Sequence, residues 1–226
     1  MPPQCHITAP SPKNQEEFNF LKKNMKIGPK YKIARRLKAP IFEKTQTQKF
    51  SLREERKKPK KSFNKPKTDF GIQLNEKQKA RMFYCVTEKQ FAKYVNQALA
   101  KKTSSPTVNL LKYLEHRLDN VVWRAGILPT HLSARQAVSH GHFLVNGKKV
   151  YVPSFSVREG DKITIREGSK GSKMFSELEN KMIETRVPAW IAWDLKTKEL
   201  SIKDSAFTEK TDLLFDLGQV IEYYQR

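Results

Sequence analysis

The sequence predicts an α+β fold. We expect a mostly helical N-terminal body with an inserted small α+β module, in which two helices pack on a short, hairpin-rich sheet. Three observations predict this. Apolar residues recur at helical spacing between residues 75 and 125. Short apolar runs flank Asn146-Gly147, the strongest two-residue hairpin signal. Basic residues crowd residues 1–150, which hold 32 Lys and Arg against 10 Asp and Glu.

Charge gives the first indication of function. The 226 residues hold 44 Lys and Arg against 23 Asp and Glu, a net charge of +21, while residues 151–226 are nearly neutral with 12 basic and 13 acidic residues. Such a one-sided field attracts polyanions, of which nucleic acid is the commonest. The alternative is a solvated, lysine-rich surface that aids solubility. No apolar run reaches the roughly eighteen residues of a membrane helix, and the isolated Cys5 and Cys85 suit a reducing cytosol.

In the first third of the chain, prolines and lysines are the main indicators of which segments are ordered. Residues 1–24 combine four prolines with polar residues and are expected to be a disordered extension. The composition changes at Met25, where the basic stretch MKIGPKYKIARR begins, and we hypothesise that Met25 is the native start. Residues 50–68 are basic and broken by proline, with no apolar face. We expect this segment to be mobile in solution and to order as an arm against phosphates.

Three helices are predicted for the body. They span residues 75–84, residues 87–100 with Thr87 as N-cap, and residues 108–125. The last is the clearest, because its leucines and valines line one face and Gly126 then offers a left-handed stop. Asp119 lies near the edge of that stripe. It is expected to be a structural hydrogen-bonding carboxylate, with a catalytic function as the alternative.

The module follows. Thr130 is expected to cap a helix that runs to about Ser139 and stops at Gly141, before strands at 143–145, 148–152 and 162–166. A helix at 172–184 and two short strands after residues 190–193 are predicted next. The apolar end LGQVIEYYQR is expected to dock on the body. The predicted domains are therefore 25–115, the arm and body; 116–180, the module; and 181–226, a C-terminal return to the body.

The segment around Gly141 holds the side chains best suited to metal binding, acid–base chemistry or anion binding. His140 and His142 lack further ligands at metal-binding spacing, so we expect no metal and no cofactor. No sequence motif for a hydrolase or for nucleotide binding occurs. The free N–H groups at the start of the 130–139 helix, together with Arg135, the two histidines, Lys148 and Lys149, predict one anion-binding face. The alternative is a purely structural interpretation, in which a histidine is hydrogen-bonded in the core and the hairpin is simply exposed to solvent.

These residues also carry a resemblance. The stretch RLDNVVWRAGILPTHLSARQAVSHGHFLVNGKKVYVPSFSVREGDKITIREGSK closely resembles the RNA-binding module named after small-ribosomal-subunit protein S-four. Because that module occurs in many proteins, the segments on either side of it are needed to identify the family. GPKYKIARR (28–36), DFGIQLNEKQKARMFYCVTEKQFAKY (69–94) and the terminal VIEYYQR resemble the ribosomal protein itself. The resemblance covers about residues 25–226 and is weakest at 37–68 and 195–215.

The resemblance implies RNA-binding positions along the chain. They are Lys30, Arg35 and Arg36 in the arm, Lys77, Lys79 and Arg81 in the EKQKxR helix, Arg117 in the RLDN signature, and Arg135, His140, His142, Lys148 and Lys149 in the module. We take Arg117 and Asp119 to be largely structural. Two departures stand out. Tyr31 and Ala34 replace the cysteines of many relatives, so no zinc is expected there, and His131 stands where many relatives have arginine, which predicts a weaker phosphate contact at pH 7.

The implied function is that of a structural constituent of the small ribosomal subunit in the cytoplasm, with no catalytic chemistry and no small-molecule substrate. It would bind small-subunit ribosomal RNA directly, nucleate assembly of the subunit body and contribute to translational accuracy. Its implied partners are that RNA, the neighbouring protein S-five and messenger RNA. Two alternatives share the same module: an RNA-modifying enzyme similar to pseudouridine synthases, and a free-standing RNA-binding regulator.

Overall fold

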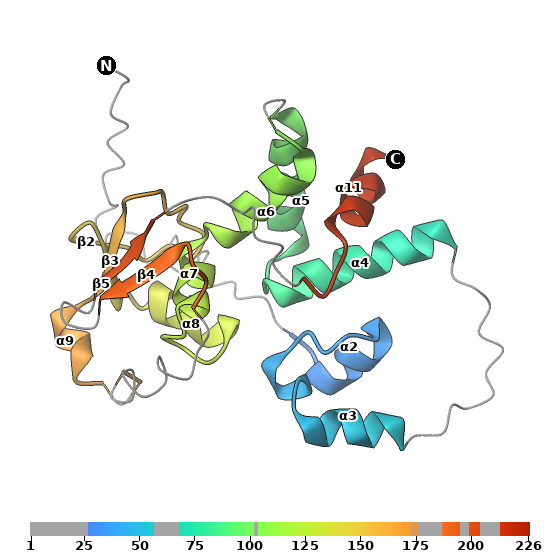
Figure 1. The fold of residues 1–226 in the computed structure, drawn as a ribbon, viewed down its shortest axis with the longest axis horizontal. Coiled ribbons are helices and arrows are strands. Elements are labelled where there is room, and N and C mark those ends of the chain that lie inside the picture. Colours follow the sequence, from blue (N-terminus) through green and yellow to red (C-terminus); the bar gives the residue numbers. More distant parts are fainter. Residues whose placement is uncertain are drawn as a thin grey trace, which may run out of the picture.

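The fold has a helical part and a part that contains the sheet (Figure 1), and each has its own hydrophobic core. A computed structural model describes residues 27–56, 68–101, 104–172, 174–175, 187–194, 199–203 and 213–226. The predicted extension 1–24 lies outside these residues, as do most of the basic segment 50–68 and most of the predicted helix 172–184. The α+β class predicted from the sequence is confirmed.

The body is helical. Its elements are α2 (Lys30–Leu37), the 3₁₀ helix η1 (Glu43–Thr45), α3 (Gln48–Glu55), α4 (Asp69–Phe83), α5 (Glu88–Ala100), α6 (Pro106–Glu115) and the C-terminal α11 (Leu217–Gln225). The helix α11 packs along α4 and also contacts α5 and α6 (Figure 1). Its Val220 and Ile221 join Phe91, Leu110 and Leu114 in the core of the body. The predicted docking of the C-terminal end is thus confirmed.

The predicted helix 108–125 is wrong as a single element. The chain forms α6 and then α7 (Leu118–Arg124), because Arg117 between them has extended backbone with φ −70° and ψ 135°. Residues 116–118 pair with a segment far along the chain: the Leu118 N–H donates to the Phe155 carbonyl at 2.9 Å, and the Val157 N–H donates to that of His116 at 2.8 Å. Hydrogen bonds from this later segment replace those of a continuous helix, so the break follows from tertiary contact.

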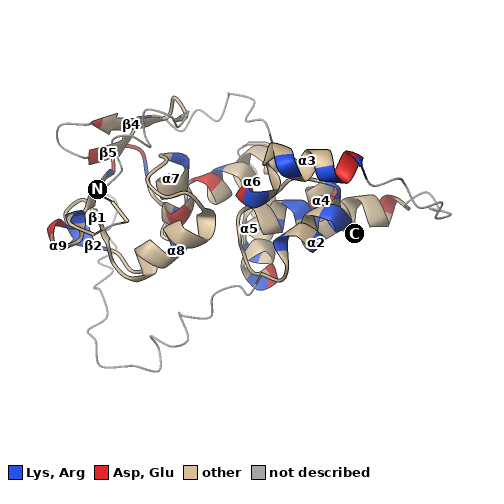
Figure 2. Cartoon of the chain, turned by 90° about the horizontal axis from the view of Figure 1, so that it is seen from below, with Lys and Arg blue, Asp and Glu red and all other residues tan. Residues whose placement is uncertain are grey.

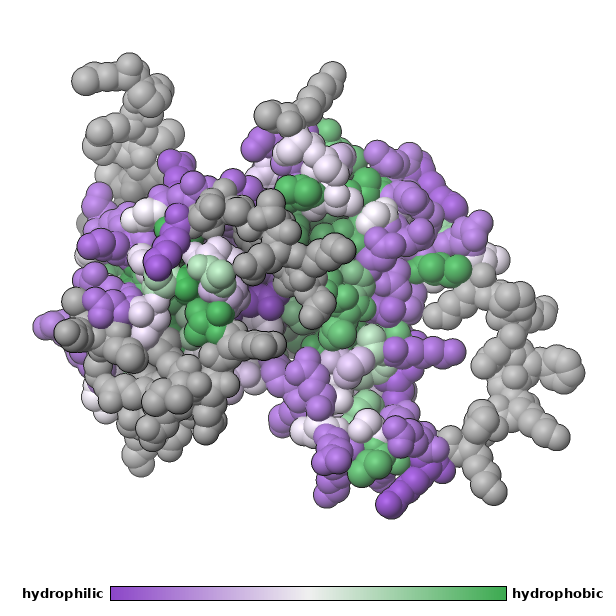
Figure 3. Space-filling model, in the orientation of Figure 1, coloured by the Kyte–Doolittle hydropathy of each residue, from purple (hydrophilic) through white to green (hydrophobic). Residues whose placement is uncertain are grey.

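The expectation for residues 50–68 is also partly wrong. Residues 50–55 complete α3, although no residue of that helix is buried. It lies beside α2 through an Arg35–Glu54 ion pair of 2.6 Å and a Tyr31–Phe50 ring contact of 5.5 Å. The surface of these two helices is mainly hydrophilic, with small apolar areas (Figure 3). Leu52 of α3 is one of the exposed apolar residues.

The module is built around a five-stranded antiparallel sheet. It comprises α7, α8 (His131–Ser139), α9 (Glu167–Lys170) and strands β1 (Phe143–Val145), β2 (Lys148–Lys149), β3 (Lys162–Ile165), β4 (Ile191–Asp194) and β5 (Glu199–Ile202), in the sheet order β2-β1-β3-β5-β4. The predicted hairpin is confirmed, since Asn146 and Gly147 have φ of 50° and 76°. The return strand is shorter than the predicted 148–152. Because β5 pairs with β3, the sheet extends past residue 180, and from residues 181–226 the described part that returns to the body is α11.

Glu115 links the two cores. Its carboxylate accepts hydrogen bonds from Tyr84 Oη at 2.7 Å, Asn120 Nδ2 at 2.6 Å, and Arg124 Nη2 and Nε at 2.7 and 3.1 Å. Glu115 belongs to α6 of the body, while Asn120 and Arg124 belong to α7 of the module. Trp123 packs against both cores beside them. The boundary between body and module is therefore a buried, fully bonded charge pair.

A second buried pair lies one turn away. Arg117 donates to both carboxylate oxygens of Asp119, at 3.0 and 2.6 Å, and to Tyr94 Oη at 2.8 Å. The side chains of Arg117 and Asp119 are 2% and 5% exposed. Asp119 is thus a structural carboxylate, which was the favoured interpretation. Together the two pairs fix α7 against α5 and α6.

We predict that Glu115→Gln destabilises the protein strongly. The amide would leave Arg124 as an uncompensated buried charge, a change that costs about 3–5 kcal/mol. Urea unfolding followed by Trp fluorescence measures the change. Glu159→Gln is a matched control, because Glu159 is an exposed carboxylate 3.8 Å from Lys112. Equal stability of the Glu115 variant and the wild type would contradict the assigned function of the joint.

Candidate nucleic-acid interface

Basic side chains and two histidines gather around Gly141, where α8 ends and β1 begins. Gly141 has φ +68°, which turns the chain and places His140 and His142 on either side. Their ring centroids are 6.1 Å apart. His142 Nδ1 lies 2.9 Å from Ser169 Oγ, and Arg166 Nε donates to the same oxygen at 3.3 Å. The end of β3 and the short helix α9 are thereby brought to the two histidines.

The hairpin adds two further side chains to this place. A Cβ on Gly141 would lie 2.5 Å from Lys149 Cε and 2.7 Å from Tyr151 Cε1, so these side chains pack directly over the glycine. Lys149 Nζ lies 4.7 Å from the centroid of the Tyr151 ring. We call this group the Gly141 cluster; it consists of His140, His142, Lys149, Tyr151, Arg166 and Ser169. Lys148 is exposed beside it on the hairpin.

The electrostatics of the cluster are those of an anion site. Burial lowers the pKa of His142 below its ordinary value, and the charges of His140, Arg166 and Lys149 lower it further. The Lys149 and Arg166 charges therefore lie close to the His142 ring, and a phosphate placed among these groups would be held by the two cations. The acidic neighbour in sequence, Glu167, points outward with a 92% exposed side chain and pairs with Lys170 at 3.4 Å. The cluster can hold an anion by charge-assisted hydrogen bonds.

The arm offers a second basic surface. Figure 2 shows Lys and Arg concentrated on the helices of the body rather than on α8. Arg36 is exposed on α2 and has no acidic partner among the described residues. Arg35 donates to Glu54, and Lys30 Nζ lies 5.6 Å from the Phe42 ring centroid. Of the three predicted arm residues, Arg36 is thus the one that an incoming phosphate reaches without displacing a partner.

The three predicted positions on α4 are neutralised within the fold. Lys77 is 5% exposed, and its Nζ donates to Glu88 at 2.7 Å and lies 4.3 Å from the Tyr223 ring centroid. Lys79 Nζ donates to Glu76 at 2.6 Å, and Arg81 Nε lies 3.4 Å from Glu88. Lys77 and Arg81 join α4 to α5, and Lys77 also joins it to α11, whereas the Lys79 pair lies within α4. The resemblance alone did not indicate this structural contribution.

Arg117 and Arg135 are likewise engaged inside the molecule. The interior pairing of Arg117 leaves it no access to a phosphate. Arg135 is half-buried, and its Nη1 donates to the carbonyl of Cys85 at 2.9 Å. Cys85 lies between α4 and α5 with φ 51°, so this bond ties the module helix α8 to the body. One nitrogen of the predicted Arg135 fork is therefore already bonded within the protein, and its contact with phosphate stays a prediction.

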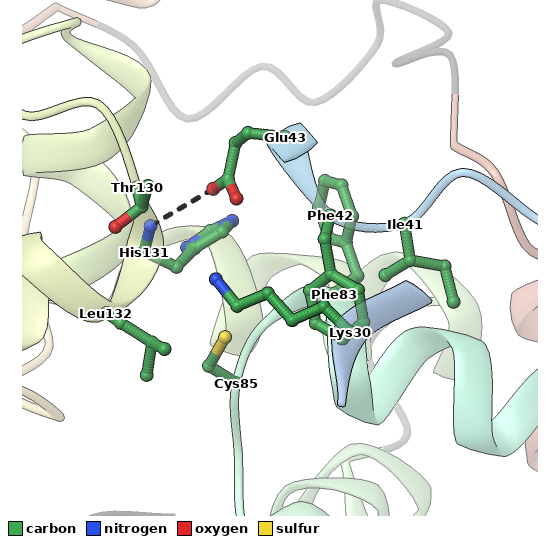
Figure 4. Close-up of a pocket in the computed structure, with 9 residues that line it drawn as sticks. All are labelled: Lys30, Ile41, Phe42, Glu43, Phe83, Cys85, Thr130, His131 and Leu132. Atoms are coloured by element: carbon green, nitrogen blue, oxygen red, sulfur yellow. Dashed lines mark hydrogen bonds between the residues drawn. The ribbon is translucent and has the colours of Figure 1, made fainter. Parts of the chain in front are cut away.

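The start of α8 is covered as well. The His131 N–H donates to Glu43 Oε1 at 3.4 Å (Figure 4). Thr130 and Ser133 cap each other at the same helix start. The expectation that these N–H groups face outward to a phosphate is wrong, because a carboxylate from the arm occupies their position. His131 is buried, stacked on Trp123 at a centroid distance of 3.8 Å. It lines a small pocket between arm, body and module and makes no surface contact of the kind the resemblance implied.

Arg166, Tyr151 and Ser169 are not among the site residues predicted from the sequence. One signal could have found Tyr151: it lies two residues after Lys149 on an extended segment, so both side chains project to the same side. No local signal marks Arg166 and Ser169, because the pairing of β1 with β3 is what carries them to His142. Within the described residues, no three His, Cys, Asp or Glu side chains are grouped so that they could hold a metal ion. No helix among those residues is long and apolar enough to span a membrane.

The helical body and the cationic module together define a basic polyanion-binding protein of the α+β class. Residues 25–115 match the model of the ribosomal protein S4/S9 N-terminal domain, and residues 116–163 match that of the S4 domain. The small ribosomal subunit protein uS4 of Desulforamulus reducens is 42% identical over 159 residues, which span 70% of this chain and 76% of that protein. The uS4 protein of Corynebacterium urealyticum is 41% identical over 70% of this chain and 79% of its own length. The chain belongs to the small ribosomal subunit protein uS4 family.

We predict that the stability of the protein falls as the pH drops below about 6.5. Burial, followed by the charges of Arg124 and Arg117, holds the pKa of His131 well below its usual 6.5, and burial also lowers the pKa of His116. Below pH 6.5 the two histidines bind protons in the unfolded chain but not in the folded protein. Proton binding therefore stabilises the unfolded state and lowers the free energy of unfolding. Each such histidine contributes a loss of up to about 1.4 kcal/mol per pH unit.

Urea unfolding at pH 7.5 and at pH 5.5 tests this. His131→Phe removes one titrating ring while keeping an aromatic stack on Trp123, so it should show a shallower decline than the wild type. An unchanged pH dependence in this variant would show that His131 does not titrate differently in the folded and unfolded states.

Proposed function

We propose that this chain binds small-subunit ribosomal RNA directly, with the Gly141 cluster and the arm as separate contact surfaces. Membership of the uS4 family makes it a structural protein of the small ribosomal subunit with an RNA-binding S4 module, and not an enzyme. Its bacterial relatives place it in the cytoplasm, on ribosomes. The observation that carries the proposal is the gathering of His140, His142, Lys149 and Arg166 around Gly141, where the described part of the chain brings no carboxylate into an ion pair with Lys149 or Arg166.

The RNA-binding residues divide into two groups. In the first group the side chains are available to RNA: His140, His142, Lys148, Lys149 and the newly found Arg166 in the module, with Arg36, Arg35 and Lys30 in the arm. In the second group, Lys77, Lys79, Arg81, Arg117 and Arg135 position these surfaces by bonds within the protein. Contacts of the first group are mainly with phosphate, which neutralises charge without reading base sequence.

The rigid joint supports a further part of the proposal. Because Glu115 and Arg135 hold body and module together, the arm and the Gly141 cluster keep a constant spacing. A protein of this kind can fix two RNA segments relative to each other, and so we propose that it nucleates assembly of the subunit body. Contributions to translational accuracy, and contacts with protein S-five and messenger RNA, are further proposals that rest on the family.

Membership of the family weakens the alternative of an RNA-modifying enzyme. The alternative of a messenger-RNA-binding regulator remains as a second activity of the same surfaces. Co-sedimentation of the chain with small subunits in a sucrose gradient tests the proposal. Recovery of the chain solely in ribosome-free fractions would overturn it.

We predict that the affinity for ribosomal RNA falls steeply with salt. Each phosphate neutralised by Lys or Arg releases counterions, and about 6–10 such contacts would give a slope of several log units of affinity per tenfold rise in salt. Filter binding across a salt series measures the slope. A nearly salt-independent affinity would argue against phosphate contacts as the main source of binding.

We predict that Arg166→Ala weakens binding to every RNA ligand about equally and lowers the salt slope by about one unit, because one phosphate contact is lost. Arg158→Ala is the matched control. Arg158 is an exposed arginine in the turn that precedes β3, whereas Arg166 directly follows that strand. If both variants bound as the wild type does, Arg166 would have no place in the interface.

A further inference from the structure

Tyr151 differs from the other members of the Gly141 cluster because it carries no positive charge. The residue is 39% exposed, although its ring lies against Gly141 and has the Lys149 ammonium over it, 4.7 Å from the ring centroid. Phosphate recognition uses cations and N–H donors, so it gives no reason for an exposed aromatic ring at this position. The ring therefore points to a second kind of contact.

The chemistry of RNA narrows what that contact is. In an A-form duplex the faces of the bases are hidden in the stack, and side chains reach mainly phosphates and 2′-hydroxyl groups. An unpaired nucleotide presents both a phosphate and the flat face of its base. Proteins hold such nucleotides by stacking the base on an aromatic side chain next to a basic groove. The Gly141 cluster combines these two parts within one group of packed side chains.

The charges on the cluster favour RNA over an apolar protein partner. Val152, next in sequence, is also 39% exposed, so a small apolar surface exists here. However, Lys149 lies on the tyrosine ring and Arg166 shares Ser169 with His142 in the same cluster, and a protein partner would have to supply carboxylates to balance these cations. An RNA nucleotide brings the balancing charge with it.

We propose that the Gly141 cluster binds an unpaired nucleotide of its RNA, with the base stacked on Tyr151 and the adjoining phosphate held by Lys149, Arg166 and His142. This inference rests on the proposed function and names the RNA feature recognised: a bulge, loop or junction rather than a continuous duplex. The cations supply affinity for any RNA, and the tyrosine supplies the preference for an unpaired base.

The test uses the full chain and two RNAs of equal stem length, one a blunt duplex and the other the same duplex with a three-nucleotide bulge. Fluorescence anisotropy measures the affinity of the wild type, Tyr151→Ala, Tyr151→Phe and Val152→Ala for each. We expect Tyr151→Ala to lose roughly 5- to 150-fold in affinity for the bulged RNA, the range that one base–aromatic stack represents, and less than about 2-fold for the duplex. Tyr151→Phe and Val152→Ala should bind both RNAs as the wild type does.

Three outcomes would overturn the inference. An equal loss on both RNAs would mean that Tyr151 acts only by positioning Lys149. No loss on either RNA would mean that the ring takes no part in binding. A loss in Val152→Ala as large as in Tyr151→Ala would indicate a general apolar docking surface. The proposed function fails separately, if the wild type itself shows no salt-dependent binding to either RNA.

Discussion

The buried carboxylate of Glu115 is the constraint on which the rest of the structure depends. It accepts four hydrogen bonds, from a tyrosine of the body and from two residues of the module, at the point where α6 ends and the chain turns into α7. A charge in this position is costly unless it is fully paired, so the bonds that satisfy it also determine how the two parts meet. Burial, followed by the Glu115 charge, raises the pKa of Tyr84 well above its ordinary value, which keeps the phenol a neutral donor to that carboxylate. Body and module are thereby one folded unit in function, although each has its own hydrophobic core.

Further contacts extend the same joint to the arm. Arg135 of α8 reaches the Cys85 carbonyl of the body, and Glu43 of the arm accepts from the first N–H of α8. Arm, body and module converge on the buried His131, whose pKa is lowered because its surroundings are desolvated and cationic. The consequence is a scaffold in which the two basic surfaces face RNA from set positions. A long polyanion with a defined shape is the ligand that benefits from such fixed spacing.

The distribution of charge has a different meaning in the structure than in the composition. A large excess of Lys and Arg predicts a polyanion-binding surface, but several of these residues are engaged in ion pairs and ring contacts within the protein. Lys77 is held by Glu88 and the ring of Tyr223, and Arg117 by Asp119 and Tyr94. What remains for RNA is a smaller set with few acidic neighbours, found around Gly141 and on the arm. A basic residue therefore counts as a binding residue only after its partners within the protein are known.

The sequence by itself determined the local features. The Asn146-Gly147 turn, the cap at Thr130, the positive φ of Gly126 and Gly141 and the apolar stripes of the helices all follow from neighbouring residues, because backbone preferences and helical periodicity act over a few positions. Only the tertiary structure decided the features that depend on distant partners. The break at Arg117 results from pairing with residues 155–157, the addition of β4 and β5 from pairing with β3, and the Gly141 cluster from the meeting of α8, the hairpin and the end of β3. Whether a basic side chain is exposed to RNA or paired within the protein depends in the same way on acidic residues elsewhere in the chain. Local sequence patterns do not indicate where those acidic residues lie in the fold.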